Sequence, residues 1–196
     1  MITKLPKKVS DTSISVVKAS MLTLSLAAVC ALPTIASGPS ISGSLEVGYN
    51  YNLSIPSDSS TNAQHSYDMK SKSFTVNNAN LVFTGSDSAS GLGYDVKTVF
   101  GSDAKVNRSL DASSGGADII DLQEAFLTWG FGYGRTFGLK AGKYVTYEGI
   151  EVVEGGSNPT VTRGLLFGLL EPVSHTGIEV SNSMGAIDVH LGVING

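Results

Sequence analysis

The chain has 196 residues, enough for one domain, and only 15% of them are charged, against roughly 25% in typical soluble domains. Its 13 basic and 17 acidic residues give a formal net charge of −4, so the basic surface of a nucleic-acid-binding protein is not expected. Its single cysteine, Cys30, excludes a disulfide framework within the chain.

The N-terminal residues show the pattern of a secretory signal peptide. Four lysines precede a short apolar run at residues 21–29, and small residues follow it. The alternative is a membrane anchor, but a spanning helix needs about 20 apolar residues and this run is shorter. We therefore expect a signal peptide over residues 1–36, cleavage between Ala36 and Ser37, and a mature chain of residues 37–196. That mature chain keeps 9 basic and 16 acidic residues.

Seven segments of the mature chain alternate between apolar and polar residues. A period of two is typical of β-strands whose two faces meet different surroundings. In the first segment Leu45 lies on an apolar face and Glu46 on a polar one. The alternation in the second segment is irregular near Phe74 and Val76. We expect strands at residues 41–53, 73–85, 92–104, 119–131, 136–145, 173–181 and 186–194.

The connections between these segments alternate in length. Long polar connections are expected at residues 54–72, 105–118 and 146–172, and short turns at residues 86–91, 130–135 and 182–185. Transmembrane barrels place long loops on one side and short turns on the other, with aromatic residues at both interfaces. Candidates for such aromatic residues are Tyr49, Tyr51, Trp129, Phe131 and Tyr133. This pattern favours an antiparallel transmembrane β-barrel over a secreted β-sandwich, which would not explain the asymmetry of the loops.

Seven strands do not close a single-chain bacterial barrel, because such barrels have even strand numbers. An open sheet also leaves two unpaired edges. We therefore expect about seven up-and-down strands of a larger barrel. The chain is then either the N-terminal portion of a longer one or a partner for other chains, so a homo-oligomer stays open.

Three stretches of the sequence resemble a known family. The opening strand SLEVGYNYNL, the strand DLQEAFLTW and above all residues 139–180, together with the signal peptide, resemble the outer-membrane porins of the β-barrel porin-2 family. The similarity covers about the whole mature chain, and the family pattern continues past residue 196. The resemblance implies a pore-forming barrel in the outer membrane of a diderm bacterium, and it leaves the solute undefined.

In a barrel of this kind the polar face of each strand lines the lumen. Side chains of both signs are expected there, with an acidic excess that slightly favours cations. The lining candidates on strands are Glu46, Asn50, Asn78, Asn80, Asp95, Lys97, Glu124, Lys140 and Glu179. Arg163 joins them if the connection at residues 146–172 folds into the lumen. The alternative for that connection is a solvated surface loop.

The expected function is passive diffusion of small hydrophilic solutes, with the lipid bilayer and those solutes as partners. The alternatives are a non-conducting surface protein, an adhesin or scaffold acting through its long loops, and a soluble secreted sandwich. Catalysis is not expected. Ser174 and His175 are adjacent and point to opposite faces, His190 shares a face with Asp188 as a lining pair would, and His65 lies in a loop. No cofactor or metal is expected, because no cluster has ligand spacing.

Overall fold

The computed structural model describes residues 39–53, 61–62, 66–110, 119–160 and 162–195. Contacts divide the chain into two units, Met1–Ala31 and Leu32–Gly196, and every described residue belongs to the second. The expected signal peptide and its cleavage site at Ala36 and Ser37 lie outside the described residues, as does His65.

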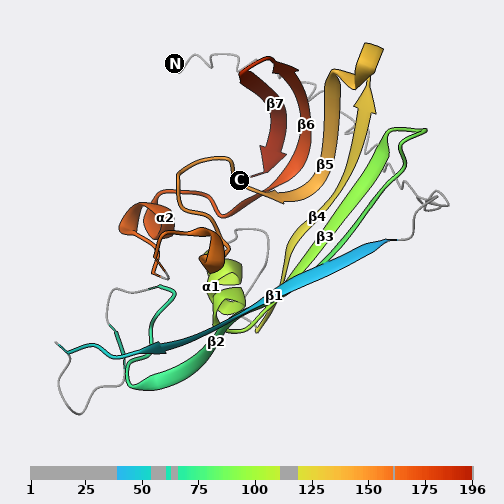
Figure 1. Cartoon of the computed structure of the whole chain (residues 1–196). Helices are drawn as coiled ribbons and strands as arrows, with labels where there is room; N and C mark the ends of the chain where they lie inside the picture. Colours follow the sequence, from blue (N-terminus) through green and yellow to red (C-terminus); the bar gives the residue numbers. More distant parts are fainter. Residues whose placement is uncertain (1–38, 54–60, 63–65, 111–118, 161, 196) are drawn as a thin grey trace, which may run out of the picture. The chain divides into compact units, whose positions relative to one another are not determined.

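Seven antiparallel strands form one sheet, in which each strand pairs with its neighbours in the sequence (Figure 1). The strands are β1 (Ser40–Asn50), β2 (Ser73–Ser86), β3 (Leu92–Phe100), β4 (Ile120–Phe131), β5 (Phe137–Val145), β6 (Ser174–Met184) and β7 (Ile187–Asn195). A sandwich needs two packed sheets, whereas the described strands form a single up-and-down sheet that is not closed between β1 and β7. The predicted fold class, part of an antiparallel barrel, is confirmed.

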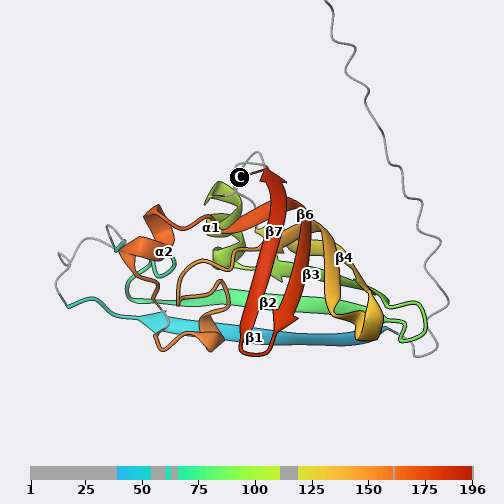
Figure 2. The ribbon, with the colours of Figure 1, turned by 90° about the horizontal axis from the view of Figure 1, so that it is seen from above.

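The sheet is curved and twisted, and the helices lie on its concave side (Figure 1). They are α1 (Ser102–Leu110) and α2 (Leu165–Leu169), with short 3-10 turns η1 (Tyr133–Arg135) and η2 (Gly155–Ser157). The twist accumulates from strand to strand, so β7 crosses the direction of β1 at a steep angle (Figure 2). Within the described residues, no helix has the length and hydropathy to cross a membrane, a finding that concerns helices alone.

Two β-bulges interrupt the strands, and one of them accounts for the irregular alternation near Phe74 and Val76. Between β1 and β2 the register shifts after Glu46, so Asn77 is an extra residue on β2. Between β3 and β4 it shifts after Lys97, so Gln123 is an extra residue on β4. Each bulge reverses the phase of its strand, because side chains alternate with a period of two. Apolar residues therefore remain on the same face of the sheet before and after each bulge.

The two faces of the sheet have opposite character. The convex face carries large apolar side chains that stay exposed, such as Leu45 (69%) and Leu191 (73%). The concave face carries polar side chains, several of them buried: Asn78, Asn80, Asp121, Gln123 and Glu179. A soluble sheet with one wet face turns its apolar side to a core, and this sheet turns it outward. The arrangement suits a sheet with lipid on its convex side.

Aromatic rings gather at both rims of the sheet. Tyr49 and Phe74, whose ring centroids are 4.7 Å apart, lie on the rim that bears the long connections. Trp129, Phe131 and Phe137 form a second group beside the turn between β4 and β5, with successive centroids 5.3 and 5.5 Å apart. Rings at two levels are what the interfaces of a bilayer favour.

Three expected boundaries differ in the structure. The first strand ends at Asn50 and not at residue 53. The third ends at Phe100, where the chain turns into α1 with Asp103 in its first turn and Arg108 in its last, charges that favour a helix. The last hairpin is tighter than expected, because β6 continues to Met184 and β7 begins at Ile187. Gly185 has a φ of 69° there, which glycine adopts without strain.

Candidate lumen wall and loop cluster

The strand residues expected to line a lumen lie on the concave face. Cross-strand pairing puts Glu46 opposite Asn78, Lys97 opposite Glu124, and Lys140 opposite Glu179, and residues that pair directly share a face. The remaining strand candidates follow these residues at intervals of two, apart from the bulges: Asn50, Asn80 and Asp95.

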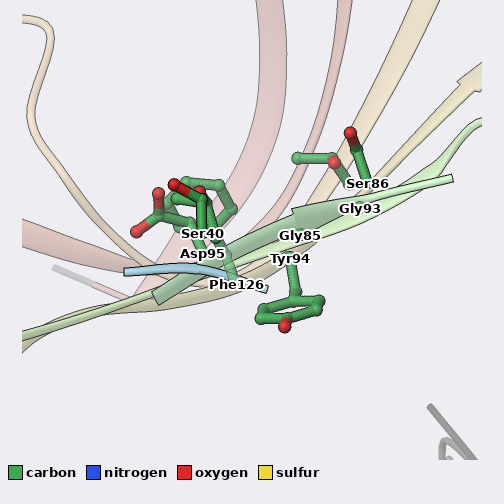
Figure 3. A pocket seen from close by; sticks show the side chains of 9 residues that line it. Ser40, Gly85, Ser86, Gly93, Tyr94, Asp95 and Phe126 are labelled. Atoms are coloured by element: carbon green, nitrogen blue, oxygen red, sulfur yellow. The ribbon is translucent and has the colours of Figure 1, made fainter. Parts of the chain in front are cut away.

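A hollow of ≈ 350 Å³, lined by polar and apolar groups, lies on β2, β3 and β4 near the short turns, with Asp95, Ser86 and Phe126 among its lining (Figure 3). Ser86 and Tyr94 project from opposite sides of the sheet in this view (Figure 3). Tyr94 also borders an apolar depression with Val96, Leu127 and two alanines. The two sides of the same strands thus differ in polarity, as the sequence alternation predicts.

Three segments far apart in the sequence form a cluster on the concave face. This loop cluster comprises residues 66–72, α1, and residues 146–160 and 162–173. Its apolar centre consists of buried side chains: Tyr67, Val106, Val153, Phe167 and Val173. The main-chain bond from Thr146 N to Val173 O (3.3 Å) joins the two ends of the longest segment. The loop cluster therefore has a small core of its own.

Arg163 lies at the centre of the loop cluster. Its guanidinium is 3.3 Å from the Asp103 carboxylate, lies over the Tyr67 ring at 4.1 Å and donates to the Val153 carbonyl. The side chains of Arg163 and Asp103 are 1% and 0% exposed. Arg163 thus binds one segment of the cluster to another and does not face open space, which differs from the lining position expected for it.

Burial controls the protonation of Asp103. Desolvation raises the pKa of this carboxyl to about 7, with Arg163 opposing the rise and Glu46 adding to it. Burial also raises the pKa of Tyr67, whose hydroxyl donates to Asn107 Oδ1 at 2.8 Å. Both groups stand outside the strands, on the loop cluster.

Glu154 connects the loop cluster to the sheet. Its carboxylate forms an ion pair with Lys97 on β3 and accepts from Gln123 Nε2 at 3.5 Å. Lys97 is also 3.9 Å from Glu124. The next residue, Gly155, lies so close to Glu46 on β1 that a Cβ there would be 2.1 Å from a carboxylate oxygen. Residues 154 and 155 therefore rest on the concave face.

The two bulges lie where the loop cluster meets the sheet. Gln123, the extra residue of β4, bonds Glu154. Asn77, the extra residue of β2, donates to Glu46 Oε1 at 3.2 Å, and Glu46 touches Gly155. Each bulge thereby adds a polar side chain to the concave face at the contact.

Apart from the contacts of the loop cluster, a second polar network of side chains lies on β5, β6 and β7. The Lys140 ammonium is 4.8–5.1 Å from the centroids of three rings and contacts the Tyr147 hydroxyl. Tyr147 donates to Glu179 Oε1 at 3.1 Å, and His190 Nδ1 is 2.7 Å from the same oxygen. Burial beside Glu179 raises the pKa of Tyr147 to about 12, so its hydroxyl stays a donor at neutral pH. Asp188 instead accepts from Ser183.

Sequence reasoning missed several residues of the loop cluster and of the second polar network. Phe126, Tyr144 and Tyr147, which with Lys140 form the second network, read as ordinary strand or loop aromatics. Asp103 and Glu154 lie in connections, where no period indicates a partner. Alternation offered two signals, the inward phase of Phe126 next to the outward Leu127, and that of Tyr144, which lies four residues after Lys140 on the same strand.

Comparison with known proteins gives one match. Neither a curated protein nor a solved structure matches the chain. The family model described as "Putative beta-barrel porin-2, OmpL-like" matches residues 39–196, which include all seven strands. This match confirms the resemblance of the sequence. The chain belongs to the β-barrel porin-2, OmpL-like family, whose name implies a porin-like β-barrel of the outer membrane.

Proposed function

We propose that the chain forms part of the wall of an outer-membrane channel through which small hydrophilic solutes diffuse passively. The observation that carries this proposal is the contrast between the two faces of one sheet. The convex face exposes side chains such as Leu45 and Leu191, and the concave face carries charges of both signs. A sheet between lipid and water is stabilised by this arrangement, because its apolar side chains lie against lipid and its charged side chains stay hydrated in the lumen.

The loop cluster narrows this channel in our proposal. Support comes from its contacts with β1, β3 and β4 through Glu154 and Gly155, which hold it against the concave face. The Asn158 side chain makes two bonds to the Val152 main chain, at 2.8 and 2.7 Å, and so keeps the segment ordered. A narrowing built on such contacts selects solutes by size.

The charges beside the narrowing favour cations weakly. Carboxylates of Glu46, Glu124 and Glu154 lie together there, and Lys97 is the cation that pairs with two of them. We further propose that residues 1–36 are a signal peptide cleaved between Ala36 and Ser37. Porin families are generally non-enzymatic, so we assign the chain no reaction.

Single-channel recording tests the channel. The purified protein, folded in detergent and added to planar bilayers, should give stepwise conductance. The double variant Glu154→Ala/Arg163→Met should enlarge the steps, because it loosens the loop cluster. Lys105→Met, an exposed change on the same cluster, should leave them unchanged. A folded, membrane-inserted protein without conductance would refute the channel.

That negative result would favour a non-conducting surface protein acting through its loops. One observation supports this second candidate. Helix α2 and the residue after it expose four leucines: Leu165, Leu166, Leu169 and Leu170. Apolar side chains gathered on a loop often mark a contact with another macromolecule. A folded protein that binds cells or matrix without conducting would establish that role.

A further inference from the structure

A second hollow, of ≈ 220 Å³, opens on the concave face between the end of β5 and strands β6 and β7. Tyr144, Tyr147, His175, Glu179 and His190 are among its lining. We propose that it is a binding subsite for a neutral sugar ring, which makes sugars a preferred class among the solutes of the channel. The inference rests on the proposed channel function for the route by which the sugar reaches the hollow. The binding itself is argued from the residues of the hollow.

The ring of Tyr147 is held in place before any ligand enters. Its hydroxyl contacts Lys140 and donates to Glu179, and its ring lies 4.6 Å from that of His190. Yet Tyr147 remains 55% exposed. A fixed and exposed aromatic ring offers apolar contact to the C–H face of a sugar at small entropic cost.

Charge in the hollow disfavours ionic ligands. An anion meets the carboxylates of Glu148 and Glu179. For a cation, the attraction of these carboxylates is opposed by Lys140, which is not among the lining residues but whose ammonium is 4.9 and 4.8 Å from the centroids of the Tyr144 and Tyr147 rings. A second cation beside these rings would be repelled by this ammonium. A neutral ligand avoids both penalties.

The polar groups of the hollow fit hydroxyl groups, which both donate and accept. Carboxylates accept, and the Thr146 hydroxyl and the imidazoles do either. His175 Nδ1 is buried without a hydrogen-bond partner among the described atoms, so this ring carries bonding capacity that the protein leaves unused. On the opposite wall Gly192 and Ile194 present a small and an apolar surface.

Size limits the ligand to one ring at a time. The volume of ≈ 220 Å³ is below the roughly 300–1,000 Å³ of pockets for drug-sized ligands. A longer saccharide would therefore place one unit in the hollow and leave the rest along the concave face.

Ligand-observed saturation-transfer NMR on the detergent-folded protein tests the subsite. The probes are D-glucose, D-glucosamine and D-glucuronate, which share a ring and differ in charge. We expect transfer to glucose and much weaker transfer to both charged sugars. Tyr147→Ala should weaken glucose binding by roughly tenfold, the size expected for loss of one aromatic contact. Tyr49→Ala, a ring on the convex face, is the matched control.

A second variant keeps the test valid if Tyr147→Ala disturbs folding. His175→Leu preserves size and removes the ring nitrogens, and it should also weaken glucose binding. Equal binding of all three sugars, absence of transfer to glucose, or full binding by a folded Tyr147→Ala or His175→Leu would each overturn the subsite. Conductance without glucose binding refutes the subsite alone, and glucose binding without conductance refutes the channel alone.

Discussion

At the scale of single residues, Arg163 joins three parts of the loop cluster. It contacts Asp103 on α1, the Val153 carbonyl and the Tyr67 ring. Such a charge is costly to bury unless its partners are in place. The cluster is therefore expected to open as a unit when Arg163 is lost.

Replacement of Arg163 by Met should favour opening of the cluster by about 2 kcal/mol, the scale of hydrogen bonds to a charged group. The measurement is the rate of thiol labelling at Val153→Cys, a position that is 2% exposed, divided by the rate at Ile150→Cys, a position that is 93% exposed. Cys30 is changed to Ser in both variants. Lys105→Met is the control. Unchanged labelling in Arg163→Met would show that these contacts contribute nothing.

Asp103 should make opening of the cluster depend on pH. Its pKa is about 7 in the cluster and about 3.9 when exposed, so the closed state binds the proton more tightly. The stability of the closed state therefore falls as pH rises from about 4 to about 7, and this fall ends above 7. Arg163, Glu46 and Tyr67 are the ionisable groups that face it.

The same labelling ratio checks this dependence between pH 5 and pH 8. The ratio should rise with pH in the native sequence and stay flat in Asp103→Asn, which has no proton to lose. An equal slope in Asp103→Asn would assign the dependence to another group.

At the scale of elements, β5 bends at a glycine. Gly142 has a φ of 138° and pairs with Phe126 on one side and Gly177 on the other. A Cβ at Gly142 would be 2.2 Å from the Ala125 carbonyl oxygen. Glycine here lets the strand curve, and it leaves room on the concave face for the aromatic rings around Lys140.

The change Gly142→Ala should lower the free energy of unfolding by about 1–3 kcal/mol, because alanine is strained at this φ. Urea unfolding in lipid vesicles measures the loss. Gly156→Ala is the matched control, since a Cβ there meets nothing within 4 Å. Equal midpoints for both variants would mean that β5 relaxes around the added methyl group.

The strands were predictable because apolar and polar residues alternate along each of them, one kind for each face of the sheet. Leu139 and Ala141 alternate with Lys140, and no distant residue is needed to place them. The bulge at Asn77 was visible only as irregular alternation near Phe74 and Val76, since one extra residue reverses the phase, and the bulge at Gln123 was not recognised. Helix α1 was missed because the strand pattern ran on into Ala104, and its helical character depends on burying Asp103 and Asn107 against the cluster.

The side-chain contacts of the loop cluster could not be predicted from alternation. Asp103 and Arg163 are 60 residues apart, and Lys97 meets Glu154 only when the loop folds back over the sheet. No local period specifies which loop carboxylate reaches which strand cation. The polar face of the sheet was thus predictable, and the loop residues that contact it were not.

At the scale of the whole molecule, the proposed function places lipid on the convex side of the sheet and water on its concave side. Val180 on β6 belongs to the convex set and its neighbour Ser181 points the other way. Placing Arg at Val180 should cost about 2–4 kcal/mol if the position is near the middle of the bilayer. The same change at Ser181 should cost little.

Urea titration of folding into lipid vesicles compares Val180→Arg with Ser181→Arg. Losses of equal size would remove the distinction between a lipid-facing and a water-facing side. A larger loss at Ser181 would reverse the assignment of the faces.

Residues 154 and 155 of the loop cluster contact the wall outside the strand ladder. Glu154, which touches Lys97 and Gln123, takes no part in the strand ladder. The cluster can therefore detach and return while every strand pairing persists, as a cooperative unit separate from the sheet. In folding, we expect its docking to follow the pairing of β1 to β4, because its partners come from these strands. We therefore expect the sheet to form first, and the loop cluster to be the last part to dock and the first to detach.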